Sequence, residues 1–122
     1  MDPETIVRQF CEAVKNLDVE TLLGFFTEDA VYHNIPIDPV QGREAIGATL
    51  GMFLGPATKA EFEILAIASN GATVLTERID RFEIGGKSIA LPVMGAFEVT
   101  PEGGISAWRD YFDMSQFTSQ MS

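Results

Sequence analysis

The segment Val74–Ile84 alternates as a β-strand does, but it carries a charged pair among its apolar positions. Because successive strand side chains point to opposite faces, Arg78 and Asp80 share a face with Phe82 and the two terminal residues. Removing a charge from water costs on the order of several kcal/mol unless the charge is paired and hydrogen-bonded. A cation and a carboxylate two residues apart can pair, so this strand predicts either a structural ion pair or a chemical site in an apolar pocket.

The rest of the chain predicts helices first and strands afterwards. Apolar residues recur at helical spacing over 2–17, 18–26 and 41–55. A short strand is expected at 30–35, and alternation predicts further strands over 60–68, 74–84, 89–99 and 105–113. This order favours one α+β domain spanning residues 1–122, with helices packed on one face of a mostly antiparallel, curved sheet that encloses a pocket.

Composition excludes several classes of function. The chain has 122 residues and 46% hydrophobic residues, enough for one domain with a real core, but it has no run of about 18 apolar residues that could span a membrane. A net charge of -10 disfavours nucleic acid and anionic membrane surfaces as partners. The single cysteine, Cys11, excludes an internal disulfide, and the start of the chain lacks a secretory pattern, so we expect a cytoplasmic protein.

The last predicted strand also places a charged residue on an apolar face, because Asp110 shares a face with the aromatic residues Trp108 and Phe112. If both apolar faces look inward, Asp80 and Asp110 meet in one pocket with Arg78 near both. Two carboxylates that share one cation cannot both ionise cheaply, so one should keep a proton while the other acts as a base. The alternative is that the strand is shifted by one residue and Asp110 faces solvent.

Two further polar residues, Tyr32 and Asn34, lie two apart on the first predicted strand and could hold a water molecule beside a carboxylate. The competing interpretation is that they only shape the turn before Pro36. His33 falls on the opposite face, and a lone histidine cannot build a zinc site, so no metal is expected. Cys11 lies on the apolar stripe of the first helix and is expected to be a core residue.

These motifs resemble a known family. Tyr32–Pro36, Glu77–Asp80 and Gly104–Asp113, in this order and approximate separation, are similar to limonene-1,2-epoxide hydrolases, and the similarity runs from the first helix almost to the end of the chain. The resemblance implies a cone-shaped NTF2-like (SnoaL-like) fold with a curved mixed sheet, and a homodimer formed through the sheet face.

The resemblance also implies roles for the residues. Asp110 would be the base that deprotonates water, Tyr32 and Asn34 would hold that water, Asp80 would protonate the epoxide oxygen, and Arg78 would bridge the two carboxylates. The partners would be water and a small apolar epoxide, which becomes a vicinal diol in one step without a cofactor. From facing and family position, five apolar residues are expected to bind substrate: Phe53, Phe82, Leu91, Val93 and Phe112.

Two other kinds of function remain open on such a fold. One is a ketosteroid-isomerase-like or polyketide-cyclase-like enzyme, in which a lone carboxylate shuttles a proton; an arginine between two acids is unnecessary for that chemistry. The other is a non-catalytic module that binds a small molecule. Fold alone does not choose between them.

Overall fold

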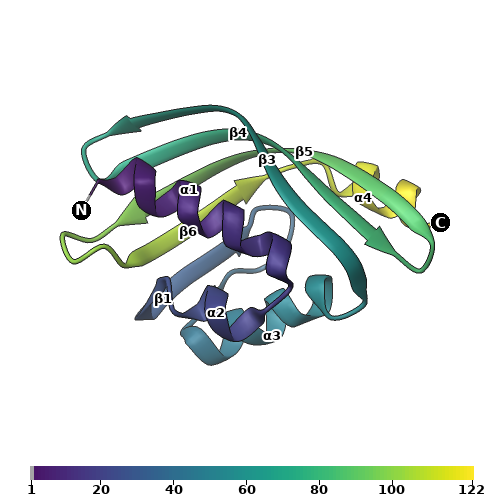
Figure 1. Ribbon diagram of the computed structural model, residues 1–122, viewed down its shortest axis with the longest axis horizontal. Helices are drawn as coiled ribbons and strands as arrows, with labels where there is room; N and C mark the ends of the chain where they lie inside the picture. Colours follow the sequence, from purple (N-terminus) through teal and green to yellow (C-terminus); the bar gives the residue numbers. More distant parts are fainter. Residues whose placement is uncertain (1) are drawn as a thin grey trace.

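The computed structural model describes residues 2–122, which form one six-stranded sheet with helices packed against it (Figure 1). The helices are α1 (Pro3–Ala13), the 3₁₀ helix η1 (Val14–Asn16), α2 (Val19–Leu23), α3 (Arg43–Leu54) and α4 (Met114–Met121). The strands are β1 (Phe26–Asn34), β2 (Val40–Gln41), β3 (Ala57–Asn70), β4 (Thr73–Ile84), β5 (Lys87–Val99) and β6 (Ile105–Tyr111). The α+β class and the helix-covered, mixed sheet are confirmed.

The sheet has the strand order β2-β1-β6-β5-β4-β3. From β3 to β6 it is an antiparallel meander, whereas β1 returns to pair in parallel with β6. In Figure 1 the long strands arch over α1, and α2 and α3 lie below them. The parallel pairing sets Tyr32 opposite Trp108 and Asn34 opposite Asp110, so the polar pairs of two distant segments become neighbours.

Helix α1 fills the space under the arch because its apolar residues form one stripe. Ile6, Val7, Phe10 and Cys11 are all buried, and each large side chain of this kind contributes roughly 1.5–3 kcal/mol when it leaves water. Phe10 meets the Trp108 ring edge-on, with ring centroids 5.0 Å apart. The helix therefore closes the core directly behind the polar residues of β6.

The alternation predicted for β4 is present in the structure. Val74, Thr76, Arg78, Asp80, Phe82 and Ile84 are buried, and the residues between them are exposed or half-buried. The charged pair therefore does lie on the inner face of the sheet. Asp110 also lies inside, so the alternative of a shifted last strand is wrong.

Three local expectations are wrong. The second helix ends at Leu23, and Phe26 instead begins β1, where it pairs with Ile105 of β6. The last strand ends at Tyr111, and a helix that the sequence analysis did not predict, α4, follows it. Asp113 begins this helix, since its side chain accepts a hydrogen bond from the backbone of Ser115 at 2.9 Å.

Across residues 2–122, no helix combines the length and apolar character needed to cross a bilayer.

Candidate active site

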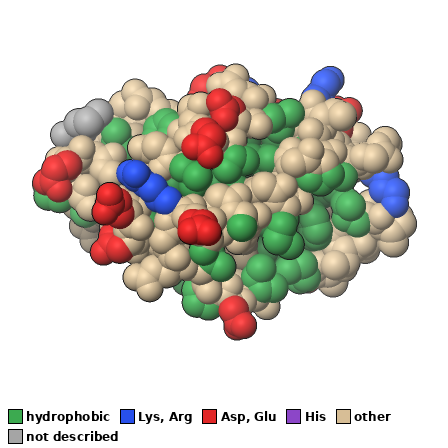
Figure 2. All heavy atoms as spheres, turned by 90° about the horizontal axis from the view of Figure 1, so that it is seen from below, with side chains coloured by type: hydrophobic (Ala, Val, Ile, Leu, Met, Phe, Trp, Pro, Cys, Tyr) green, Lys and Arg blue, Asp and Glu red, His purple; other side chains and the backbone are tan. Residues whose placement is uncertain are grey.

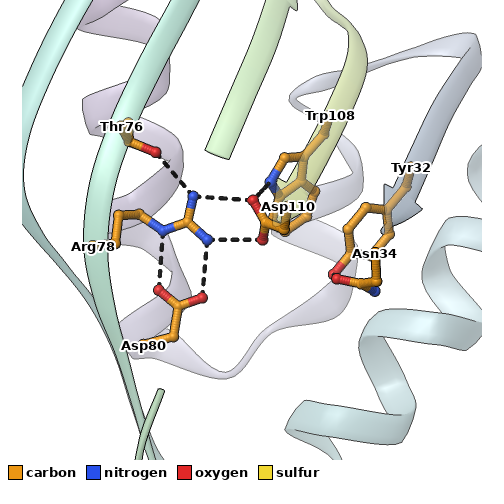
Figure 3. A network of polar contacts seen from close by, with 7 residues as sticks. All are labelled: Tyr32, Asn34, Thr76, Arg78, Asp80, Trp108 and Asp110. Atoms are coloured by element: carbon orange, nitrogen blue, oxygen red, sulfur yellow. Dashed lines mark hydrogen bonds and ion pairs between the residues drawn. The ribbon is translucent and has the colours of Figure 1, made fainter. Parts of the chain in front are cut away.

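The site is organised by Arg78, whose five N–H groups are all used (Figure 3). Nε and Nη2 donate to the two oxygens of Asp80 at 3.0 and 2.9 Å. Nη1 and Nη2 donate to the two oxygens of Asp110 at 3.2 and 2.7 Å. The remaining N–H, on Nη1, donates to Oγ1 of Thr76 at 3.0 Å. One guanidinium thus holds two carboxylates in fixed orientations.

The two carboxylates and the guanidinium are out of water, with Arg78 0%, Asp110 3% and Asp80 4% exposed. If both acids were ionised, the trio would carry one uncompensated negative charge in an apolar interior. Burial raises the pKa of Asp80, the pairing with Arg78 lowers it, and the nearby Asp110 raises it again, so that the pKa lies at about 6. Burial alone would lower the pKa of Arg78, but Asp110 and Asp80 raise it, so the guanidinium stays charged. Asp80 therefore keeps a proton at pH values below about 6.

Asp110 has one donor that Asp80 lacks, since the indole N–H of Trp108 donates to its Oδ1 at 2.7 Å. Trp108 is fully buried. Its ring stacks on the ring of Tyr32, with centroids 4.0 Å apart and planes 9° apart. The two carboxylates around Arg78 are therefore not equivalent.

Tyr32 and Asn34 stand beside Asp110 on the neighbouring strand β1. The Tyr32 hydroxyl donates to Oδ1 of Asn34 at 3.2 Å. Burial raises the pKa of Tyr32 well above its ordinary value of 10.0, so the phenol stays neutral. The phenol oxygen can still accept a hydrogen bond, and the Asn34 amide can still donate one.

These groups open onto a cavity of about 650 Å³, its open mouth included. Four polar side chains line it, and the rest of its wall is apolar; the polar ones are Tyr32, Asn34, Asp80 and Asp110. All five residues expected to bind substrate line this cavity: Phe53, Phe82, Leu91, Val93 and Phe112. Seen from the side of α2 and α3, apolar side chains gather on the half of the molecule toward α4 (Figure 2).

Comparison with known proteins shows to which family the chain belongs. A model of the limonene-1,2-epoxide hydrolase catalytic domain matches residues 1–122. The chain belongs to the limonene-1,2-epoxide hydrolase family. Epoxide hydrolase EphG of Mycobacterium tuberculosis (strain ATCC 25618 / H37Rv) is 36% identical over 108 residues, covering 88% of this chain and 71% of EphG. This chain is thus an epoxide hydrolase of the limonene-1,2-epoxide hydrolase type, which confirms the resemblance.

Solved structures agree with this assignment. A limonene-1,2-epoxide-hydrolase-like epoxide hydrolase of M. tuberculosis superposes with a TM-score of 0.82 and 34% identity, covering 95% of this chain and 86% of that one. A SnoaL-like polyketide cyclase structure from Shewanella denitrificans superposes with a TM-score of 0.87 but only 17% identity, covering 98% of this chain and 96% of that one. The second likeness shows the shared fold alone, and it confirms the NTF2-like architecture of this epoxide hydrolase.

The cavity of the epoxide hydrolase also has walls that the sequence analysis missed. Phe62 lies on β3, where its ring faces the Arg78 guanidinium at 4.7 Å from the ring centroid. Met114 and Phe117 come from the unpredicted α4. The other missed lining residues come from η1 and α3: Val14, Leu50 and Leu54.

Thr76 and Gly95 were also missed as parts of the site. Thr76 was placed on the correct face, but a threonine in a strand carries no signal of a role. A Cβ on Gly95 of β5 would lie 2.7 Å from Oδ1 of Asp110, 2.9 Å from Oγ1 of Thr76 and still closer to Nη1 of Arg78. A glycine inside a strand is the signal that could have found this close approach.

Within 2–122, no three His, Cys, Asp or Glu side chains are grouped so that they could hold a metal ion. Burial raises the pKa of Cys11 to about 12, so the thiol remains protonated at neutral pH. Its location in the core is the one expected from the sequence.

Proposed function

We propose that this epoxide hydrolase adds water to an apolar epoxide in a single step, giving a vicinal diol by general acid and base catalysis. One observation carries the proposal: Arg78 binds both Asp80 and Asp110, and each carboxylate also borders the cavity. An acid and a base are thereby held on one rigid guanidinium. A ketosteroid-isomerase-like mechanism needs a single carboxylate base and no second acid. It therefore does not account for a pair of carboxylates bridged by one arginine.

In this proposal Asp110 is the base. Its Oδ1 already accepts from Arg78 and Trp108, whereas Oδ2 accepts only from Arg78. A water molecule would therefore give its proton to Oδ2. The same water would donate its other proton to the Tyr32 oxygen and accept from the Asn34 amide, because the Tyr32 hydroxyl proton is already given to Asn34.

Asp80 is the acid. It carries the proton at pH values below its pKa of about 6. As the water oxygen bonds to one ring carbon and that carbon's bond to the epoxide oxygen breaks, Asp80 gives its proton to the epoxide oxygen. When the water proton moves to Asp110, the trio again holds one proton, so its total charge does not change during the reaction. This avoids creating an uncompensated buried charge at the transition state. Such positioned proton transfers typically contribute about 10²–10⁴-fold in rate each.

The substrate class follows from the cavity wall. Beyond the four polar site residues, the lining contains only apolar side chains, five of which are phenylalanines: Phe53, Phe62, Phe82, Phe112 and Phe117. A polar substituent far from the epoxide ring would lose its hydrogen bonds to water and find no partner here. We therefore propose apolar epoxides with little polarity outside the ring as substrates.

Replacing Asp110 by Asn tests the base. The amide keeps the shape of the carboxylate but cannot accept a proton, so diol formation from a panel of apolar epoxides should fall by at least about 10²-fold. Asp113→Asn is a matched control, since Asp113 caps α4 outside the cavity lining and should leave turnover near wild type. Retained turnover in Asp110→Asn would remove Asp110 from the base role.

The absence of a covalent intermediate is tested by isotope. In a single turnover in ¹⁸O-enriched water, the diol should contain one ¹⁸O atom from the first product onward. Unlabelled oxygen in that first product would show that a protein carboxylate attacked the ring and that an ester was hydrolysed afterwards.

We also propose a cytoplasmic homodimer. The free, buried thiol of Cys11 agrees with a reducing compartment. On the face of the sheet turned away from the helices, Leu75, Met94 and Tyr111 are each about half exposed, at 49%, 52% and 49%. Apolar side chains grouped on an open sheet face are typical of an interface between copies.

A further inference from the structure

We propose that Trp108 is a positioning residue that decides which of the two carboxylates acts as the base. Its indole N–H holds the negative charge on Asp110 and leaves the shared proton on Asp80. This inference rests on the proposed function, in which the two acids have different roles.

The two carboxylates differ in the number of hydrogen-bond donors that reach them. Arg78 treats the two carboxylates alike, because it gives each of them two hydrogen bonds. Arg78 alone would therefore leave the location of the proton undecided. The only further donor that reaches either acid among residues 2–122 is the Trp108 indole, at 2.7 Å from Asp110. A third N–H favours the ionised form of the acid that receives it.

The indole is held too firmly to turn away. Trp108 is fully buried between the ring of Tyr32 on one side and the ring of Phe97 on the other, whose centroid lies 5.6 Å away at an interplanar angle of 13°. Phe10 meets it edge-on from α1. An indole is a donor only, so it cannot stabilise a protonated Asp110 by accepting its proton.

Other groups around Asp110 do not provide this asymmetry. The titratable or charged groups that face it from the surrounding elements are Arg78 and Asp80 of β4, Tyr32 of β1 and Cys11 of α1. Tyr32 and Cys11 are buried and neutral, and β5 presents only Gly95. Thr76 contacts Arg78 rather than either acid. Trp108 is thus the group whose removal should redistribute the proton.

The wild-type protein allows a direct test, because it has a single tryptophan and therefore a single indole N–H resonance. Near pH 7 that proton should resonate far downfield and exchange slowly, as expected for a bond to a carboxylate. Asp110→Asn, which offers only a neutral acceptor, should shift it strongly upfield, whereas Asp80→Asn should shift it much less. An indole resonance that follows Asp80 instead of Asp110 would overturn the proposal.

Trp108→Phe removes the N–H and keeps an aromatic ring in the stack. With ¹³C-labelled aspartate, the wild-type carboxyl spectrum should place the shared proton on Asp80, and the variant should show it divided between both acids. The acid limb of kcat/KM should move to higher pH, and kcat at pH 7 should fall about 10- to 100-fold with little change in KM. Phe26→Leu is the matched control: its ring also packs on Trp108, at 6.0 Å, and its loss should lower stability without moving either titration.

An unchanged carboxyl titration in folded Trp108→Phe would refute the role of the indole. The spectra also separate this inference from the proposed function, since they need no substrate. If the wild-type enzyme hydrolysed no epoxide but the proton still moved in Trp108→Phe, the proposed reaction would be wrong and the assignment of the proton would stand.

Discussion

At the scale of single residues, one arginine binds two buried carboxylates, and the proposed mechanism gives these two side chains different roles. Both carboxylates are buried and both pair with Arg78, so the proton that one must keep is shared within a hydrogen-bonded trio. Burial raises the pKa of Asp80 to about 6, which moves its titration into a range that kinetics can follow. In the proposed mechanism, the direction of this shift determines on which side of pH 6 activity is lost.

We expect kcat/KM to be lost as the pH rises above about 6. A general acid works only while it is protonated, and the pKa of Asp80 in the substrate-free enzyme is about 6. On the alkaline side of this pKa, kcat/KM should therefore fall about tenfold per pH unit. Initial rates of diol formation from pH 5 to 9, corrected for spontaneous hydrolysis, measure this limb. Asp80→Asn should be nearly inactive throughout, and a wild-type rate that climbs through pH 6 would contradict Asp80 as the acid.

Gly95→Ala should damage the site without altering any polar group. Its new Cβ would fall 2.7 Å from Asp110 Oδ1 and closer still to the Arg78 guanidinium, so the ion pair must shift. Such overpacking typically costs about 1–3 kcal/mol, and a displacement near 1 Å can reduce turnover about 10²-fold. Urea denaturation and kcat measure both effects.

Gly51→Ala is the matched control for this substitution. A Cβ at this position of α3 would meet nothing within 4 Å, so the variant should gain roughly 0.5–1 kcal/mol from helix propensity and keep its activity. Equal behaviour of the two variants would show that Gly95 is not needed for close packing against the trio.

At the scale of elements, the local sequence pattern predicted the burial of side chains within a single strand or helix. It did not predict structure that depends on pairing with a distant strand. The alternation of β4 and β5 follows from side-chain burial, so the inner face and its charged residues could be identified in advance. Phe26 could not, because helical spacing continues through it and only its pairing with Ile105 of β6 makes it a strand residue. The short β2 likewise exists through its pairing with β1.

The most informative miss is α4, which is rich in serine, threonine and glutamine and has no buried residue. Its place is fixed by long-range contacts. Beyond Met94, β5 has no β6 partner, and Gln120 fills that edge by bonding both backbone groups of Ala90, at 2.8 and 2.9 Å. Lys87 adds a bond to the carbonyl of Met121. None of these contacts leaves a local sequence pattern.

Gln120→Ala should therefore loosen α4 without unfolding the domain. The two hydrogen bonds to Ala90 and a third, to the Gln116 carbonyl, disappear. Each contributes about 0.5–1.5 kcal/mol net, so amides of residues 114–121 should exchange faster by roughly one to three orders of magnitude. KM for apolar epoxides should rise, because Met114 and Phe117 of this helix line the cavity. Hydrogen exchange followed by mass spectrometry measures the first effect and steady-state kinetics the second.

Gln116→Ala, one turn earlier, is the control for α4. Its side chain makes no hydrogen bond within residues 2–122, so exchange in the helix should stay close to wild type. Alanine is a better helix former than glutamine, so propensity alone would slow exchange in both variants. Similar acceleration in both would mean that the Gln120 contacts with β5 do not determine the stability of α4.

At the scale of the whole molecule, the sheet separates two surfaces of different character. Its inner face holds the trio and the cavity, whereas its outer face presents Met94 beside Glu77 and Tyr111, its partners on the neighbouring strands. A chain of net charge -10 would repel a second copy at long range unless apolar contact compensates. The half-exposed Met94 and Tyr111 offer such contact on the side away from the cavity.

This arrangement predicts that one new charge on the outer face breaks the proposed dimer. The wild-type protein should sediment at twice its chain mass of 13.3 kDa, and Met94→Glu should sediment as a monomer because a carboxylate buried between two sheets lacks a partner. Met52→Glu carries the same change to a residue of α3 that is 75% exposed and lies off the sheet, so it should remain dimeric. Sedimentation equilibrium across a range of concentrations distinguishes these outcomes. A monomeric wild-type protein, or a Met94→Glu variant that still pairs, would exclude the outer sheet face as the contact between copies.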